Sequence, residues 1–232
     1  MNDPLFSIVL PVHNESEYVE SVIEAYQKAL TQLGHSYELV LVINGCRDNS
    51  AEVCRQMAER DTSVRVIESE RGGWGLAVKL GLSAARGSIL CYTNLARTAP
   101  QDLLRHLLDA VAHPQVVVKA NRKVRDNWKR RLGGLLYNLE CRTLFDLSTW
   151  DVNGTPKVFP RSFAKLLALT RDDDLIDAEF NLICRREGYP LLEVPVFSSG
   201  RQGGKSTTTV SSAVKMYWGA YNLWREQRKQ IR

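Results

Sequence analysis

The stretch SIVLPVHNES, residues 7–16, decides the fold class of this chain. After Ser7, residues 8–12 form an unbroken apolar run, which is typical of a strand whose two faces are both buried. Three polar residues follow, and from Ser16 to Leu33 apolar side chains recur at the spacing of an amphipathic helix. The stretch therefore predicts the strand, loop and helix of a parallel α/β sheet.

The same unit recurs through the first hundred residues. Apolar runs alternate with helical patterns at Tyr37–Ile43, Ser50–Arg60, Val64–Ile67, Trp74–Ala85 and Ser88–Thr93. This alternation predicts an α/β fold with a mainly parallel central sheet flanked by helices. Ligands of such sheets bind at the carboxyl ends of the strands. The loops at 12–15, 43–50 and 93–100 are therefore the candidate binding loops.

The second half of the chain is less regular. Helices are predicted at 102–112, 132–144, 161–169, 177–187 and 211–230, and strands at 116–118, 158–159 and 191–197. Since 232 residues suit one domain with a sizeable core, we expect a single domain over 1–209 with halves at 1–100 and 101–209. Residues 210–232 would follow it as a C-terminal amphipathic helix.

The composition of the chain bears on its cellular compartment, on membrane spans and on the kind of partner it binds. The five cysteines show no C-x-x-C spacing, so we expect neither disulfides nor a zinc site, and a reducing cytosol. The chain has no basic leader and no run of about 18 apolar residues, so no membrane span is expected. Seven lysines and arginines crowd residues 119–131. These cations could bind anionic lipid, a phosphorylated substrate or nucleic acid. The chain contains no nucleic-acid-binding motif.

Six segments carry a family resemblance: SIVLPVHNESEYV, INGCRDNSAEV, RGGWGLAVKLGLSAARGSILCYTN, DVNGTPKVFPR, DAEFNLICRREGYPLLEVPV and RQGGKS. In this order they resemble the inverting GT-A glycosyltransferases of family 2, in the dolichyl-phosphate-mannose-synthase-like group. The resemblance implies a GT-A fold whose first hundred residues bind a nucleoside-diphosphate sugar. It also implies a polyprenyl phosphate acceptor at the inner, cytoplasmic face of the membrane.

The first two loops supply the expected donor-binding residues. The resemblance implies that Pro11 and Glu15 border the nucleotide base and ribose, with His13 between them. Asn44 stands where the family has an acid, and its amide could bind a base edge. Asp48 either binds the donor or serves as the N-terminal cap of the next helix.

The third loop departs from the family. The resemblance implies an Asp-x-Asp motif that binds Mg²⁺ or Mn²⁺, but Asn94 and Ala96 occupy the two acidic positions. Hard cations prefer anionic oxygen ligands. We therefore expect no ordinary metal site, and a guanidinium of Arg97, with Arg122, in place of the metal on the leaving diphosphate. The alternative is a protein that binds nucleotide sugars without catalysis. Near the Gly72–Gly75 stretch, Lys79 is a further candidate phosphate contact.

The acceptor half offers two kinds of chemistry. Transfer to a glycan or lipopolysaccharide hydroxyl needs a general base, and Asp151 or Asp177 could be that base. Alternatively, Asp177 only places a negative charge at the start of a helix, where the helix dipole favours it. A phosphate acceptor needs no base and requires cations instead. The resemblance implies that it is held by the following residues: Arg122, Arg201, Lys205 and Ser206.

The last helix has an apolar face made by Val210, Val214, Tyr217, Trp218, Tyr221 and Trp224. Lysines and arginines flank it, a pattern that suits a helix lying in a membrane interface. The stretch 132–147 is similarly apolar behind a basic segment. The alternative is packing against the core or against a second copy in a homodimer.

Overall fold

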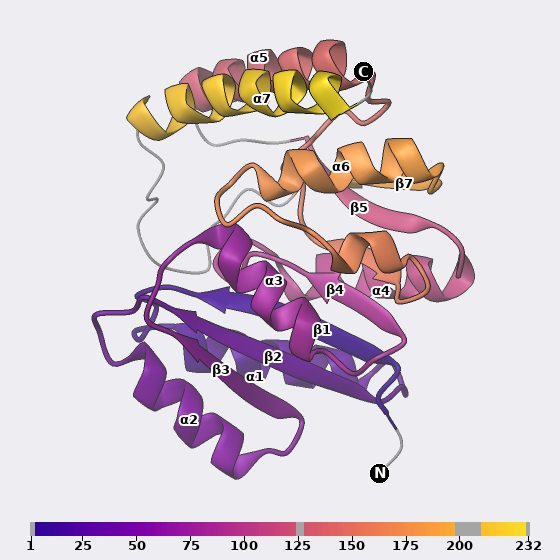
Figure 1. The fold of residues 1–232 in the computed structure, drawn as a ribbon. Coiled ribbons are helices and arrows are strands. Elements are labelled where there is room, and N and C mark those ends of the chain that lie inside the picture. Colours follow the sequence, from indigo (N-terminus) through magenta and orange to yellow (C-terminus); the bar gives the residue numbers. More distant parts are fainter. Residues whose placement is uncertain (1–2, 124–127, 198–209, 231–232) are drawn as a thin grey trace.

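In the computed structural model, residues 3–123, 128–197 and 210–230 are described, and side chains are described for these except 128–130, 210–213 and 230. The first half of the chain contains four strands and three helices in strict alternation (Figure 1). They are β1 (Phe6–Val12), α1 (Val19–Thr31), β2 (Tyr37–Asn44), α2 (Ser50–Arg60), β3 (Val64–Ser69), α3 (Trp74–Ala84) and β4 (Ile89–Tyr92).

The second half follows the predicted order of elements. It contains α4 (Pro100–Ala112), β5 (Val117–Arg122), α5 (Trp128–Phe145), β6 (Lys157–Pro160), η1 (Ala164–Leu167), α6 (Ile176–Glu187), β7 (Leu191–Val196) and α7 (Val210–Gln230). The prediction of a helix at 161–169 is wrong, because only the 3₁₀ turn η1 forms there. Arg161 is anchored on the carbonyls of Ala85 and Gly87, and Phe163 stacks on Tyr189, so tertiary contacts override the local preference.

The strands form one seven-stranded sheet in the order β3-β2-β1-β4-β6-β5-β7. β1, β2, β3 and β4 are parallel to one another, as are β5 and β7. β6 is antiparallel to both of its neighbours, β4 and β5. The prediction of a mainly parallel α/β sheet is therefore confirmed.

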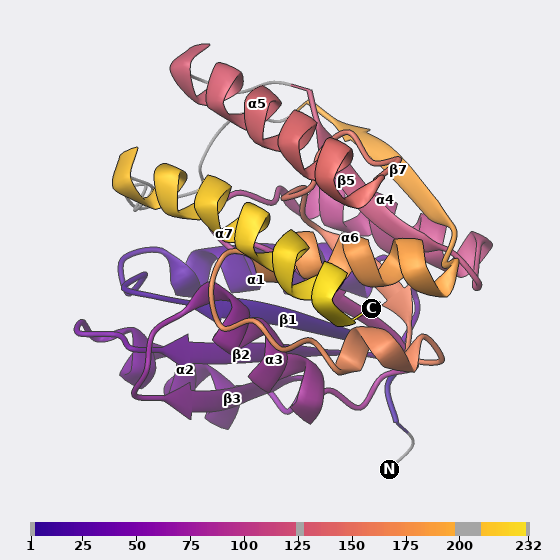
Figure 2. The ribbon, with the colours of Figure 1, turned by 45° about the horizontal axis from the view of Figure 1, so that its top comes forward.

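Helices cover both faces of the sheet. One core cluster joins the strands to α1, α2 and α4, and a second joins them to α3, η1 and α6. A third cluster packs α5 and α7 on the outer side of α6. Figures 1 and 2 both show α5 and α7 running side by side, and Figure 1 shows them at the end of the molecule away from α2. A pocket lies at the carboxyl ends of β1, β2 and β3.

Helix α3 approaches the sheet closely because it carries Gly81. A Cβ atom there would overlap side-chain atoms of Val9 on β1 and crowd Val42 on β2. Gly133 on α5, in contrast, has open space around the position of a Cβ atom.

We expect Gly81→Ala to lower the free energy of unfolding by roughly 1–3 kcal/mol, because it overpacks the interface between α3 and the sheet. Gly133→Ala should be neutral or stabilise by up to about 1 kcal/mol, because alanine is the better helix former. Urea denaturation of both variants measures the difference. Equal unfolding midpoints would contradict the close approach of α3.

Candidate functional site

A pocket lies at the carboxyl ends of β1, β2 and β3, where parallel α/β sheets bind ligands. Its volume is about 900 Å³. Its walls are formed by His13, Asn14, Ile43, Gly45, Cys46, Arg47, Ala51, Glu68, Ser69, Glu70 and Gly72. Of the predicted donor-binding residues, His13 lines this pocket. Cys46, Arg47, Glu68 and Glu70 were missed, although the strand-end rule applied to β3 would have drawn attention to the last two.

Asn44 organises the pocket from behind. Its side-chain nitrogen donates to the Val12 carbonyl at 3.0 Å, and its side-chain oxygen accepts from the Gly73 N–H at 2.9 Å. Its own carbonyl is 2.7 Å from Nδ1 of His13. Asn44 is 4% exposed. Both ends of the amide therefore make hydrogen bonds within the protein and join three loops, and contact of Asn44 with a nucleotide base stays a prediction.

Asp48 connects the starts of two helices. One carboxylate oxygen accepts from the Ser16 N–H at 3.0 Å, and the other accepts from the N–H and hydroxyl of Ser50 at 3.1 and 2.6 Å. Burial alone would raise the pKa of Asp48, but the hydrogen bonds from Ser50 and Ser16 lower it to about 2. In the structure Asp48 thus holds the first two binding loops together and does not line the pocket.

 Pro11, at the end of β1, is buried in the sheet. The Glu15 N–H donates to the Ser50 hydroxyl at 2.8 Å. This hydrogen bond ties the first loop to the start of α2.

We expect acid to remove the contribution of Asp48. Because its pKa in the folded protein is about 2, below the ordinary value of 3.8, its charge stabilises the fold above pH 4 and this contribution is lost as the pH falls from 4 to 2. Asp48→Asn should therefore be less stable than the wild type at pH 7, with a gap that closes toward pH 2. Chemical denaturation at several pH values measures it. A gap that stays constant down to pH 2 would show that the carboxylate charge is not involved.

The third loop does not fit a divalent cation. After β4 the chain continues with Asn94, Leu95 and Ala96, and the last two are 1% and 0% exposed. Leu95 belongs to the hydrophobic core, while the buried side-chain oxygen of Asn94 has no hydrogen-bond partner. One amide oxygen is a poor ligand set for Mg²⁺ or Mn²⁺. Within the described ranges, no three His, Cys, Asp or Glu side chains gather as a metal site would require. Arg97 follows directly, at a partly buried position.

Lys79 is not directed at the pocket. Its Nζ lies 2.6 Å from a carboxylate oxygen of Asp172 and donates to the Thr170 carbonyl at 2.8 Å. Gly73 and Gly75, which precede Lys79, allow the start of α3 to approach the same loop closely. A Cβ atom on either glycine would collide with the backbone of residues 171–173. The structure thus joins Lys79 to the loop before α6, and a phosphate contact of Lys79 stays a prediction.

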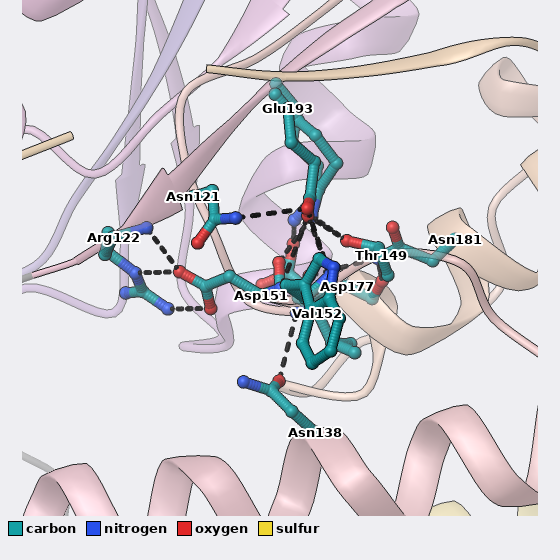
Figure 3. Close-up of polar contacts among 12 residues, drawn as sticks. Asn121, Arg122, Asn138, Thr149, Asp151, Val152, Asp177, Asn181 and Glu193 are labelled. Carbon is teal, nitrogen blue, oxygen red and sulfur yellow. Dashed lines mark hydrogen bonds and ion pairs between the residues drawn. The ribbon is translucent and has the colours of Figure 1, made fainter. Parts of the chain in front are cut away.

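Asp151 and Arg122 form one unit at the end of β5 (Figure 3). The Asp151 carboxylate accepts from the Arg122 N–H at 3.0 Å, from Nε at 2.8 Å and from Nη2 at 2.9 Å. The Asp151 side chain is 3% exposed and that of Arg122 is 27% exposed. Burial lowers the pKa of Arg122, but the Asp151 charge outweighs it and the net pKa is raised. The carboxylate is therefore fully committed to a cation.

Asp177 is paired in a similar way. It lies beside Nζ of Lys157, accepts from the Tyr92 hydroxyl at 2.9 Å and accepts from Nε1 of Trp74 at 3.2 Å. Lys157 is 0% exposed, and burial lowers its pKa to about 8 against the partly compensating charge of Asp177. Glu179, two residues on, accepts from the backbone N–H groups of Thr170 and Arg171. Both acids at the start of α6 thus have fixed partners.

The predicted acceptor residues fall into two groups. The structure brings Asp151 together with Arg122, and Asp177 with Lys157. Arg201, Lys205 and Ser206 lie outside the described residues, so their placement stays a prediction. Sequence reasoning missed Lys119 and Glu193, which form a buried ion pair beside Asp151. The only signal for them was a charged residue next to the apolar run at the start of β5 and another within the apolar β7.

An α/β sheet with a single antiparallel strand and a pocket at its strand ends defines the GT-A class of transferases. The family model described as glycosyl transferase family 2 matches residues 7–167. The chain therefore belongs to glycosyl transferase family 2.

Two comparisons with curated proteins are informative. The chain is 29% identical over 171 residues to the undecaprenyl-phosphate 4-deoxy-4-formamido-L-arabinose transferase of Pseudomonas aeruginosa (strain LESB58), covering 72% of this chain and 50% of the relative. It is 28% identical over 204 residues to the transferase of the same name from Edwardsiella ictaluri, covering 86% of this chain and 62% of the relative. The chain thus spans only about half to three fifths of these relatives.

Solved structures support the fold. Glucosyl-3-phosphoglycerate synthase from Mycobacterium tuberculosis, in complex with Mn²⁺, uridine diphosphate and phosphoglyceric acid, superposes with a TM-score of 0.69 at 18% identity. The similarity covers 94% of this chain and 76% of the synthase. The same synthase with glucosyl-3-phosphoglycerate gives a TM-score of 0.67 at 17% identity, over 94% of this chain and 77% of the synthase. At these identities the likeness concerns the fold alone.

Proposed function

We propose that this protein transfers a sugar from a nucleoside-diphosphate sugar to a polyprenyl phosphate at the cytoplasmic face of a membrane. A phosphate oxygen of the acceptor attacks the anomeric carbon. The bond from that carbon to the donor diphosphate breaks, and the diphosphate leaves with the electron pair. Attack from the face opposite the leaving group inverts the configuration of the sugar.

The state of the two candidate bases carries this proposal. Asp151 accepts three hydrogen bonds from Arg122, and Asp177 is bonded to Lys157, Tyr92 and Trp74. A general base must take up a proton from the acceptor, and a carboxylate held by a buried cation is a weak base. An acceptor phosphate has a pKa of about 6 for its second ionisation. It therefore arrives with a charged oxygen and needs no base.

Positively charged side chains of this protein are assigned to the acceptor phosphate and to the departing diphosphate of the donor. The Arg122 guanidinium uses one edge on Asp151, and its fork has five N–H donors, so others remain for a phosphate. By resemblance, Arg201, Lys205 and Ser206 complete the acceptor site. Arg97, at the end of the loop that lacks carboxylates, is assigned to the departing diphosphate, since guanidinium groups bind such anions in a bidentate manner. On this proposal transfer does not depend on a divalent metal.

The names of the relatives agree with this acceptor class. The matched transferases from Pseudomonas aeruginosa and Edwardsiella ictaluri are named for undecaprenyl phosphate. A loop with Leu95 and Ala96 at the expected metal site favours one other candidate, a protein that binds nucleotide sugars without turnover.

A matched pair of acceptors tests the proposal. A thermal-shift screen of UDP-, GDP-, CDP- and TDP-sugars first identifies the donor, since a ligand of the native state raises the melting temperature. Transfer is then measured to a short-chain polyprenyl phosphate and to the corresponding polyprenol, each with Mg²⁺ and with EDTA. We expect product from the phosphate alone, at similar rates in both buffers.

Each contrary result has a distinct meaning. Product from the polyprenol would point to a hydroxyl acceptor and to a carboxylate base. Strict dependence on Mg²⁺ would contradict the role given to Arg97. A melting shift without product from either acceptor would favour the binding protein.

The membrane contact is assigned to the surface of α5 and α7. Seven apolar side chains on these two helices are 38–64% exposed: Leu132, Leu135, Leu136, Leu139, Val214, Trp218 and Tyr221. The helices are joined by a hydrogen bond from the Tyr217 hydroxyl to the Gly133 carbonyl and by the edge contact of Tyr137 with Tyr217. Exposed Arg131 and Lys215 stand beside the apolar residues. Such a surface fits an anionic lipid interface.

The predicted apolar face of α7 is thus divided between two roles. Trp224 and Tyr217 pack against the core cluster of α5 and α6, while Val214, Trp218 and Tyr221 remain outside. No helix within the described part of the chain is both long and apolar enough to cross a bilayer.

We expect Leu135→Ser/Leu139→Ser to weaken binding to vesicles of equal parts phosphatidylglycerol and phosphatidylcholine at least tenfold, because each buried leucine contributes about 1.5–3 kcal/mol. The control Leu108→Ser/Val111→Ser removes exposed apolar side chains from α4 and should bind like the wild type. Vesicle sedimentation measures both. Equal losses in the two variants would contradict the assignment, and a shift from dimer to monomer in gel filtration would assign the surface to a homodimer.

A further inference from the structure

We infer that Glu193 is a positioning residue that orients the Arg122 guanidinium through the loop at 149–151. The inference rests on the proposed function only in assigning the oriented guanidinium to the acceptor phosphate. Glu193 does not contact Arg122 in any hydrogen bond found in the structure. It acts on the backbone that carries Asp151, and Asp151 holds Arg122.

The Glu193 carboxylate collects hydrogen bonds from the loop. It accepts from the Trp150 N–H, at 3.0 and 3.1 Å to its two oxygens, and from the Asp151 N–H at 3.3 Å. The Thr149 hydroxyl donates to it as well. Three consecutive residues are thus fixed to one side chain (Figure 3).

Strand pairing fixes Glu193 itself. Glu193 on β7 is the register partner of Lys119 on β5, and Nζ of Lys119 lies 3.2 Å from its Oε1. Lys119 also donates to the Thr149 hydroxyl at 2.6 Å and to the Asp151 carbonyl. The Lys119 side chain is 0% exposed and that of Glu193 is 15% exposed. Asn121 on β5 adds a hydrogen bond of 3.2 Å to the other carboxylate oxygen.

The consequence reaches Arg122 at the end of the same strand. With the backbone of Asp151 held at both its N–H and its carbonyl, its carboxylate meets Nε and Nη2 of Arg122 at 2.8 and 2.9 Å. Because a guanidinium is planar, fixing this edge also fixes the direction of the remaining N–H groups. The strands and the loop therefore set where a phosphate can bind.

A charged carboxylate is needed for this arrangement. Every group that faces Glu193 is a donor, including one buried ammonium. Burial raises the pKa of Glu193, but the charge of Lys119 and these donors lower it overall, which agrees with an ionised side chain. A glutamine has the same size, yet its amide N–H groups would face other donors and would leave the Lys119 charge without a counter-charge.

Glu193→Gln tests the inference, and Glu38→Gln is its matched control. Glu38 is also a buried carboxylate, 1% exposed, but it binds Ser7, Arg65 and Arg86 at the amino end of β2, away from the site. Two readouts are taken: hydrogen exchange of the Arg122 Nε–H by NMR, assigned with Arg122→Lys, and binding of geranyl phosphate by calorimetry.

We expect Glu193→Gln to speed exchange of the Arg122 Nε–H at least tenfold and to weaken geranyl phosphate binding about tenfold. Glu38→Gln should change neither, although it lowers the melting temperature. Thr149→Val, which removes one hydroxyl from the same cluster, should give a smaller effect in the same direction and serves if Glu193→Gln does not fold.

The two readouts separate the two claims. Unchanged exchange in Glu193→Gln, or in Thr149→Val if that variant stands in for it, overturns the positioning role. Faster exchange in a protein whose wild type does not bind geranyl phosphate supports that role and contradicts the proposed acceptor. If Glu193→Gln and Glu38→Gln lost geranyl phosphate binding to the same extent, the loss would reflect lower stability in general. That result would also overturn the inference.

Discussion

Two buried lysines face each other on the neighbouring strands β5 and β6, and much of the site is arranged around them. Lys119 on β5 and Lys157 on β6 are register partners, and both are 0% exposed. Like charges opposite each other in a sheet are destabilising, and each buried charge costs several kcal/mol unless it is paired. Each lysine therefore needs its own carboxylate. Glu193 and Asp177 fill that need.

This pairing explains why charged residues at the site behave unlike free catalytic groups. Asp177 neutralises Lys157, so its carboxylate is held by a buried cation. Glu193 compensates Lys119 and in doing so fixes the loop that carries Asp151. The acceptor side is thus rich in paired charges held by strands. Such a rigid arrangement favours an acceptor that brings its own negative charge.

The donor side follows a different principle. Its loops are connected by polar bonds of Asn44 and Asp48, while the third loop turns Leu95 into the core. Sequence spacing placed these loops at one edge of the sheet, because the carboxyl ends of parallel strands meet there, and a pocket lies between the first two loops and the end of β3. It did not show that side chains such as Asn44 face the protein. An amide or carboxylate at a strand end has the same sequence signature whether its partner is a ligand or a neighbouring loop.

The sequence by itself determined the α/β class, the order of the strands and helices along the chain, and which loops follow the carboxyl ends of the strands. Hydrophobic periodicity reports which faces are buried, and that suffices for elements of this length. Only the tertiary structure decided that β6 enters the sheet antiparallel between β4 and β5, which places Lys157 opposite Lys119. It alone also decided which carboxylate neutralises which cation. Pairing across strands depends on register, and register is set by packing over the whole sheet.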